Sequence, residues 1–198
     1  QPERPIYEPL YFETHRLHGA VQNAPQGNTP EYNFIYSATA VQNLDEYDEG
    51  KYNYEIYYYG SGFNTNLTNY EDANDVYPRL NPGCTHIVFT SDRTGNLELF
   101  SMTTDGGNLT QLTWDNASDV RPDWSPDSGW IVWESYRDGQ AEIYIQTYYA
   151  GNVTRLTQDD AFDGMPAWSP DGSKIAFVSY RTGGYRIYTM NTDGSGLT

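Results

Sequence analysis

Short segments in which apolar and polar residues alternate recur along the chain. LELFSM (97–102), AEIYIQ (141–146) and YRIYTM (185–190) follow this period of two, which is typical of half-buried strands. A short apolar run precedes each of them, at 87–89, 131–133 and 175–177. No stretch shows a convincing period of 3.6 residues, so the pattern predicts strands and no helix.

These segments belong to a longer repeat of 44 residues. YPRLNPGCTHIVFTS (77–91), RPDWSPDSGWIVWES (121–135) and MPAWSPDGSKIAFVS (165–179) align, and their prolines, Pro78, Pro122 and Pro166, share one register. A divergent fourth copy lies upstream, with NFIYSA (33–38) and YEIYYYG (54–60) separated by a longer loop. Pro, Asp and Gly mark the turns of each copy. Each unit therefore predicts four short strands joined by turns.

Four strands in about 44 residues form the blade unit of a β-propeller. We predict an all-β β-propeller of about four four-stranded blades, at about 20–77, 78–121, 122–165 and 166–198, with the last blade incomplete. Residues 1–19 are predicted to be a tail that contains one strand.

The motif PAWSPDGSKIAFVSYRTGGYRIYTM (166–190) resembles the TolB-type repeat, a WD40-like propeller unit. The resemblance is strong over 121–165, fair over 77–120 and weak over 20–76. The copy at 77–91 departs from the motif, because Leu80 replaces Trp and Asn81-Pro82-Gly83 replaces Ser-Pro-Asp-Gly. The family includes the periplasmic, partner-binding TolB proteins and the propellers of prolyl-oligopeptidase-like peptidases. The resemblance therefore implies the fold firmly and the function only loosely.

The tail offers a strand that the last blade lacks. The copy at 166–198 stops at the beginning of its fourth strand, which leaves an open sheet edge. Three arrangements remain open: the tail closes this chain's own ring, it pairs with another copy head to tail and makes a filament, or the chain is part of a longer propeller. The apolar residues of this candidate assembly strand are Tyr7, Leu10, Tyr11 and Phe12.

The net charge of −16 and the sequence pI near 4.3 argue against binding to nucleic acid or to anionic lipid. No apolar run reaches the roughly 18 residues of a membrane span. The single Cys84 rules out an internal disulfide. Because the chain begins with Gln, it is processed or a fragment, and we expect an extracytoplasmic location (secreted, cell surface or periplasm).

Two sets of charged residues follow the repeat. The aspartates are weak candidates for a Ca²⁺ site, but turn capping within each blade is the favoured interpretation. The arginines are expected to form ion pairs within or between blades rather than to bind an anionic ligand. No other cofactor is expected. The two sets are Asp75, Asp119 and Asp163, and Arg93, Arg137 and Arg181.

Two further features depart from a plain repeat. The acids of the loop 43–53 are candidates for binding a basic partner or a metal ion, although a solvated insertion is the favoured interpretation. Four N-x-S/T sequons are candidate glycosylation sites. The acids are Asp45, Glu46, Asp48 and Glu49, and the sequon residues are Asn66, Asn108, Asn116 and Asn152.

No catalytic motif stands out. A G-x-S-x-G elbow is absent, and His15, His18 and His86 have no apparent nucleophile partner. We therefore predict a non-enzymatic extracytoplasmic scaffold or protein-binding module that self-assembles through strand donation. The alternatives are a monomeric partner-binding propeller and the accessory propeller of a peptidase whose catalytic domain lies elsewhere.

Overall fold

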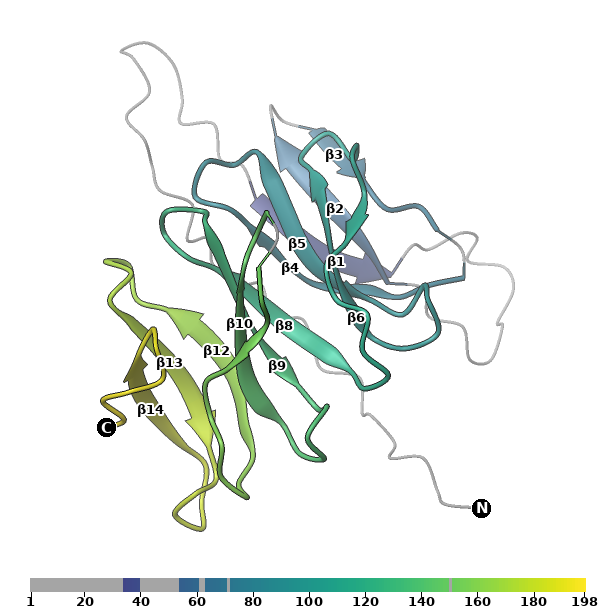
Figure 1. Ribbon diagram of the computed structural model, residues 1–198. Helices are drawn as coiled ribbons and strands as arrows, with labels where there is room; N and C mark the ends of the chain where they lie inside the picture. The colour runs from purple at the N-terminus through teal and green to yellow at the C-terminus, as the bar shows by residue number, and fades with distance from the viewer. Residues whose placement is uncertain (1–33, 40–53, 61–62, 71, 150) are drawn as a thin grey trace, which may run out of the picture.

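The computed structural model describes residues 34–39, 54–60, 63–70, 72–149 and 151–198. These residues form strands and turns without any helix, as the alternating pattern predicted, so none of them forms a helix that could span a membrane. The strands fall into four antiparallel sheets (Figure 1). The all-β fold with four-stranded units is confirmed.

The sheets follow one another in chain order. The first sheet contains β1 (Phe34–Thr39), β2 (Tyr54–Gly60) and β3 (Phe63–Asn66). The second contains β4 (Asp75–Leu80), β5 (His86–Ser91), β6 (Glu98–Thr103) and β7 (Thr110–Gln111). The third contains β8 (Asp119–Trp124), β9 (Trp130–Ser135), β10 (Glu142–Thr147) and β11 (Thr154–Arg155). The fourth contains β12 (Asp163–Trp168), β13 (Lys174–Ser179) and β14 (Arg186–Asn191).

Neighbouring sheets pack face to face. β4 contacts β8, and β8 contacts β12, so the first strands of successive blades lie side by side. Figure 1 shows the array running from β1–β3 at one end to β12–β14 at the other. Among the described strands, those of the fourth sheet make no contact with those of the first, so this part of the chain is an open array.

The middle strands of the second and third sheets, β5 and β9, are buried on both faces, which explains their continuous apolar sequences. In β9, Ile131 and Trp133 face the second sheet, whereas Val132 faces the fourth. Successive side chains of a strand point to opposite faces, so one strand contributes to two cores. Three clusters of buried side chains lie between successive sheets, and we name them the first, second and third core. Their central residues are Ile87 and Phe89 (first), Val88, Ile131 and Trp133 (second), and Val132, Ile175 and Phe177 (third).

A bulge interrupts the first strand of the second, third and fourth sheets. The ladder shifts its register there, and the bulged residues Tyr77, Arg121 and Met165 have φ values of 54°, 53° and 55°. Proline follows each of them. A bulge tolerates proline inside a strand, because the residue there has no ladder hydrogen bond to lose.

The bulges allow the first strand of each of these sheets to begin before its proline. The strands begin earlier, at Asp75, Asp119 and Asp163. The aspartates therefore lie within the blades rather than in the connections before them.

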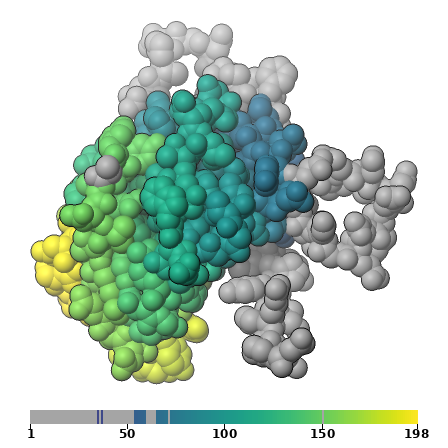
Figure 2. All heavy atoms as spheres, turned by 45° about the vertical axis from the view of Figure 1, so that its right-hand side comes forward, coloured from purple at the N-terminus to yellow at the C-terminus, as the bar shows by residue number. Residues whose placement is uncertain are grey.

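The two end sheets have three described strands each. In the fourth sheet, the backbone N–H groups of Thr189 and Thr198 each donate to the other residue's carbonyl at 2.9 Å. This pairing occupies the position that Thr154 takes opposite Ile145 in the third sheet. The fourth sheet lies at one edge of the molecule (yellow in Figure 2). Its outward face leaves Ile187 77% exposed, whereas the equivalent Ile143 and Leu99 are fully buried.

Candidate functional site

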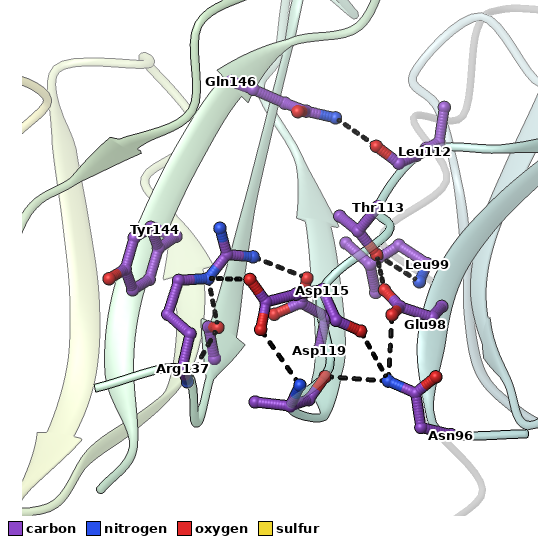
Figure 3. A network of polar contacts seen from close by, with 12 residues as sticks. Asn96, Glu98, Leu99, Leu112, Thr113, Asp115, Asp119, Arg137, Tyr144 and Gln146 are labelled. Atoms are coloured by element: carbon purple, nitrogen blue, oxygen red, sulfur yellow. Dashed lines mark hydrogen bonds and ion pairs between the residues drawn. The ribbon is translucent and has the colours of Figure 1, made fainter. Parts of the chain in front are cut away.

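Each of the last three sheets contains the same buried group of Asp, Arg and Ser. The Arg137 guanidinium donates from Nη2 to Asp119 Oδ2 at 2.7 Å and from Nε to Ser135 Oγ at 2.8 Å (Figure 3). The Asp119 side chain is fully buried, and the Arg137 guanidinium lies 4.6 Å from the centre of the Tyr144 ring. We call this group the Asp–Arg–Ser latch.

The latch repeats with almost unchanged geometry. Arg93 donates to both carboxylate oxygens of Asp75 at 2.8 Å, and Arg181 donates to Asp163 Oδ2 at 2.7 Å. In every copy the aspartate opens the first strand, and the arginine follows the second strand at a separation of 18 residues. The latch therefore fastens the first strand to the second strand's end, which is a structural role.

A second repeated group joins the third strand to the segment after the fourth. Thr113 Oγ1 donates to Glu98 Oε2 at 2.5 Å and accepts from the Leu99 N–H at 2.9 Å (Figure 3). Glu142 and Thr157 repeat this arrangement in the third sheet. Burial raises the pKa of both Glu98 and Glu142, although their hydrogen bonds oppose the shift.

An ion pair links the bulges of neighbouring sheets. Arg121 Nη1 lies 3.1 Å from Glu134 Oε2, and Glu134 also accepts from the Met165 N–H at 3.0 Å in the next sheet. The Arg121 guanidinium lies 5.0 Å from the centre of the Tyr77 ring in the preceding sheet. Burial alone would lower the pKa of Arg121, but the charge of Glu134, its hydrogen bond with Arg121 and the nearby Tyr77 and Tyr136 together outweigh burial, and the pKa rises. These contacts connect three successive sheets.

Exposed aspartates shape the hairpin turns. Asp171 accepts from Ser169 Oγ at 2.6 Å and from the Ser173 N–H at 3.0 Å. These hydrogen bonds lower its pKa to about 2. Asp127 makes the same contacts one repeat earlier, and its pKa is also lowered. Such capping favours the turn over other backbone conformations.

The structure places the Ca²⁺ candidates apart from one another, each in its own latch. The described residues contain no group of three His, Cys, Asp or Glu side chains placed to hold a metal ion. The acids of the loop 43–53 and the assembly strand lie outside the described residues. Three sequon residues, Asn108, Asn116 and Asn152, are exposed. Asn66 is half-buried and accepts hydrogen bonds from the N–H groups of Thr68 and Asn69 at 3.2 Å.

A groove of about 600 Å³ lies between the second and third sheets at their outer side. The segment 110–114 forms one wall, and residues 146–149, 151 and 152 form the other. Trp114 and Tyr149 are 74% and 81% exposed, and the ring centres of Tyr148 and Tyr149 are 4.8 Å apart. Sequence reasoning missed this site. The signal was the replacement of Thr-Asp-Gly, found at 104–106 and 192–194, by Tyr-Tyr-Ala at 148–150.

Comparison with known proteins agrees with this architecture. Residues 120–198 match the TolB beta-propeller domain family. The structure described as TolB from Agrobacterium tumefaciens has a TM-score of 0.67 and 26% identity, over 83% of this chain and 60% of that chain. TolB from Acinetobacter baumannii has a TM-score of 0.62 and 24% identity, over 74% of this chain and 37% of that chain.

A puromycin-hydrolyzing peptidase of Mycobacterium tuberculosis shares only the fold, with a TM-score of 0.60 and 13% identity over 73% of this chain and 25% of that chain. No curated protein sequence matches the chain. The chain thus spans less than two thirds of each of these structures. Residues 120–198 therefore resemble the TolB beta-propeller domain family, and the repeats before them adopt the same blade fold.

Proposed function

We propose that this chain is a non-catalytic propeller segment that binds proteins outside the cytoplasm, with the outward face of the fourth sheet as a contact surface. The exposure of Ile187 carries the proposal. At the equivalent positions, Leu99 and Ile143 are fully buried against the next sheet. Ile187, at 77% exposure, offers the same apolar face to a partner.

The structural contacts of the buried carboxylates support a non-catalytic role. The buried carboxylates of the second and third sheets take part in the latches, in the Glu–Thr groups and in the pair of Arg121 with Glu134. These contacts stabilise the sheets. The resemblance to periplasmic TolB supports an extracytoplasmic location and the binding of a protein partner.

The partner that we propose is a second copy of the chain, joined head to tail. In the third sheet, the Leu156 N–H donates to the Ile143 carbonyl at 2.8 Å. A strand from another copy would supply the equivalent donor to Ile187. The candidate donor is the predicted tail strand, residues 4–17, which lies outside the described residues. Strand addition of this kind gains main-chain hydrogen bonds, while side chains set the register.

Sedimentation velocity at about 100 µM tests this proposal. Unmodified protein should form assemblies, and so should Val153→Asp, which adds the same charge at a 42% exposed site in the turn before β11. Ile187→Asp and a deletion of residues 1–19 should both give monomers. A monomeric unmodified protein would overturn self-association. Assembly that survives the deletion would overturn strand donation by the tail.

A further inference from the structure

We propose that the groove between the second and third sheets binds a neutral carbohydrate chain. Trp114 and Tyr149 stand exposed on its two walls, and Tyr148 lies between Tyr149 and the buried Trp124, with ring centres 4.8 and 4.7 Å from them. The packing fixes Tyr148, so the groove has an aromatic base. The C–H faces of a pyranose carry partial positive charge and pack on the electron-rich face of such rings.

The polar groups of the groove suit hydroxyl ligands. Gln111, Gln146 and Asn152 bring side-chain amides, and Thr110 and Thr147 bring hydroxyls. Amides and hydroxyls both donate and accept hydrogen bonds, as sugar hydroxyls do. Gln146 Nε2 donates one long hydrogen bond, 3.5 Å, to the Leu112 carbonyl (Figure 3), so donor and acceptor capacity remains for a ligand.

The absence of charged residues from the lining of the groove favours a neutral ligand. The chain carries a net charge of −16, yet none of the residues that line the groove is charged. Recognition of a basic protein segment or of a phosphate would need charged partners. The groove volume of about 600 Å³ lies within the range typical of small-ligand sites.

Comparison between the repeats shows that this groove departs from the scaffold. One repeat later, Gln158 replaces Trp114 and Asp193 replaces Tyr149. The hollow that Gln158 lines there measures about 210 Å³, and the charged Asp159 and Arg181 also line it. Asp193 caps its turn by accepting from the Ser195 N–H at 2.9 Å. The third sheet lacks this capping aspartate, and its turn carries Tyr148 and Tyr149 instead. A local stabilising contact has thus been replaced by exposed aromatic surface, which favours a binding role.

Titration calorimetry tests the proposal with three probes: a β-1,4-linked glucose hexasaccharide, an N-acetylglucosamine hexasaccharide and a ten-residue polyproline peptide. The protein is produced without N-glycans, so that Asn108 and Asn152 stay unmodified. Trp114→Gln and Tyr149→Asp test the groove, because they restore residues that the next copy carries at the same positions. Tyr185→Ala is the control, since this 67% exposed tyrosine directly precedes β14 and does not line the groove.

We expect at least one oligosaccharide to bind, with an affinity that falls at least tenfold in Trp114→Gln and in Tyr149→Asp. Tyr185→Ala should bind like the unmodified protein, and all variants should keep their melting temperatures. Three results would each overturn the proposal: no heat with either sugar, binding of the peptide alone, or unchanged sugar affinity in both groove variants.

Discussion

At the residue scale, the latch shows why the same charged residues recur in the last three sheets. Asp119 is fully buried, and Arg137 is mostly buried, yet each is paired. A buried carboxylate without a partner is costly, so the arginine and the serine hydroxyl make the burial tolerable. The same arrangement in three sheets means that each blade fixes its own strand ends independently.

The first prediction concerns the charge of one latch. Asp119→Asn removes the negative charge and leaves Arg137 without its buried partner, so we expect a loss of about 3 kcal/mol in the free energy of unfolding. Urea unfolding measures it. The control is Asp115→Asn, because Asp115 is half-buried and lies 3.9 Å from the same guanidinium. That variant should lose less than about 1 kcal/mol. Equal losses would contradict the structural role of the latch.

The second prediction concerns Glu98, whose pKa is raised above its ordinary value of 4.5 by burial. Because folding raises this pKa, the native state holds the proton more tightly than the unfolded state. The resulting stabilisation is fully present below about pH 4.5 and is lost as the pH rises through the raised pKa. Glu98→Gln should therefore show a smaller decrease in unfolding free energy between pH 5 and pH 7 than the unmodified protein.

The control for this pH effect is Asp171→Asn. Asp171 has a pKa of about 2, so it is ionised in both states from pH 5 to pH 7. This variant should show the same decrease as the unmodified protein. If Glu98→Gln also shows that decrease, Glu98 does not titrate as the structure indicates.

At the element scale, turns and bulges set the shape of each blade. Gly95, Gly139 and Gly183 occupy the same turn in three copies, with φ values of 105°, 98° and 79°. Only glycine adopts such values at little cost. No atom lies within 4 Å of a Cβ built at any of the three, so backbone conformation alone requires glycine there.

The third prediction compares two adjacent glycines. Gly183→Ala should cost about 1–2 kcal/mol, because its φ of +79° is unfavourable for any residue with a Cβ atom. Gly184 has the same open surroundings but no positive φ. Gly184→Ala should therefore be neutral or stabilise by up to about 1 kcal/mol. Thermal unfolding measures both, and equal effects would contradict the assigned turn geometry.

The sequence predicted the strands well because the repeat supplies several copies of each signal. Alternation located β6, β10 and β14 directly. The first residue of each inner strand is harder to predict, because Pro78, Pro122 and Pro166 indicate strand starts unless a bulge accommodates them. The pairing of Asp119 with Arg137 was not predictable from spacing, since it depends on how two strands align. The groove was not predictable from the sequence, because Trp114 and Tyr149 belong to different sheets and line one groove only when the two sheets are packed together.

At the scale of the whole molecule, stability comes from faces shared between successive sheets. β9 contributes Ile131 to the second core and Val132 to the third, so each blade depends on both neighbours. Arrays of this kind gain stability from nearest-neighbour interfaces. The outward face of the fourth sheet is the position where such an interface is not formed by the described residues, and there Ile187 is exposed.

Methyl NMR tests this stacking most directly. The account predicts nuclear Overhauser contacts from the Ile131 methyls to side chains of the second core, such as Val88 and Leu99, and from the Val132 methyls to those of the third core, such as Ile175 and Met190. Contacts from both residues to the same neighbouring sheet would contradict the stacked array of blades.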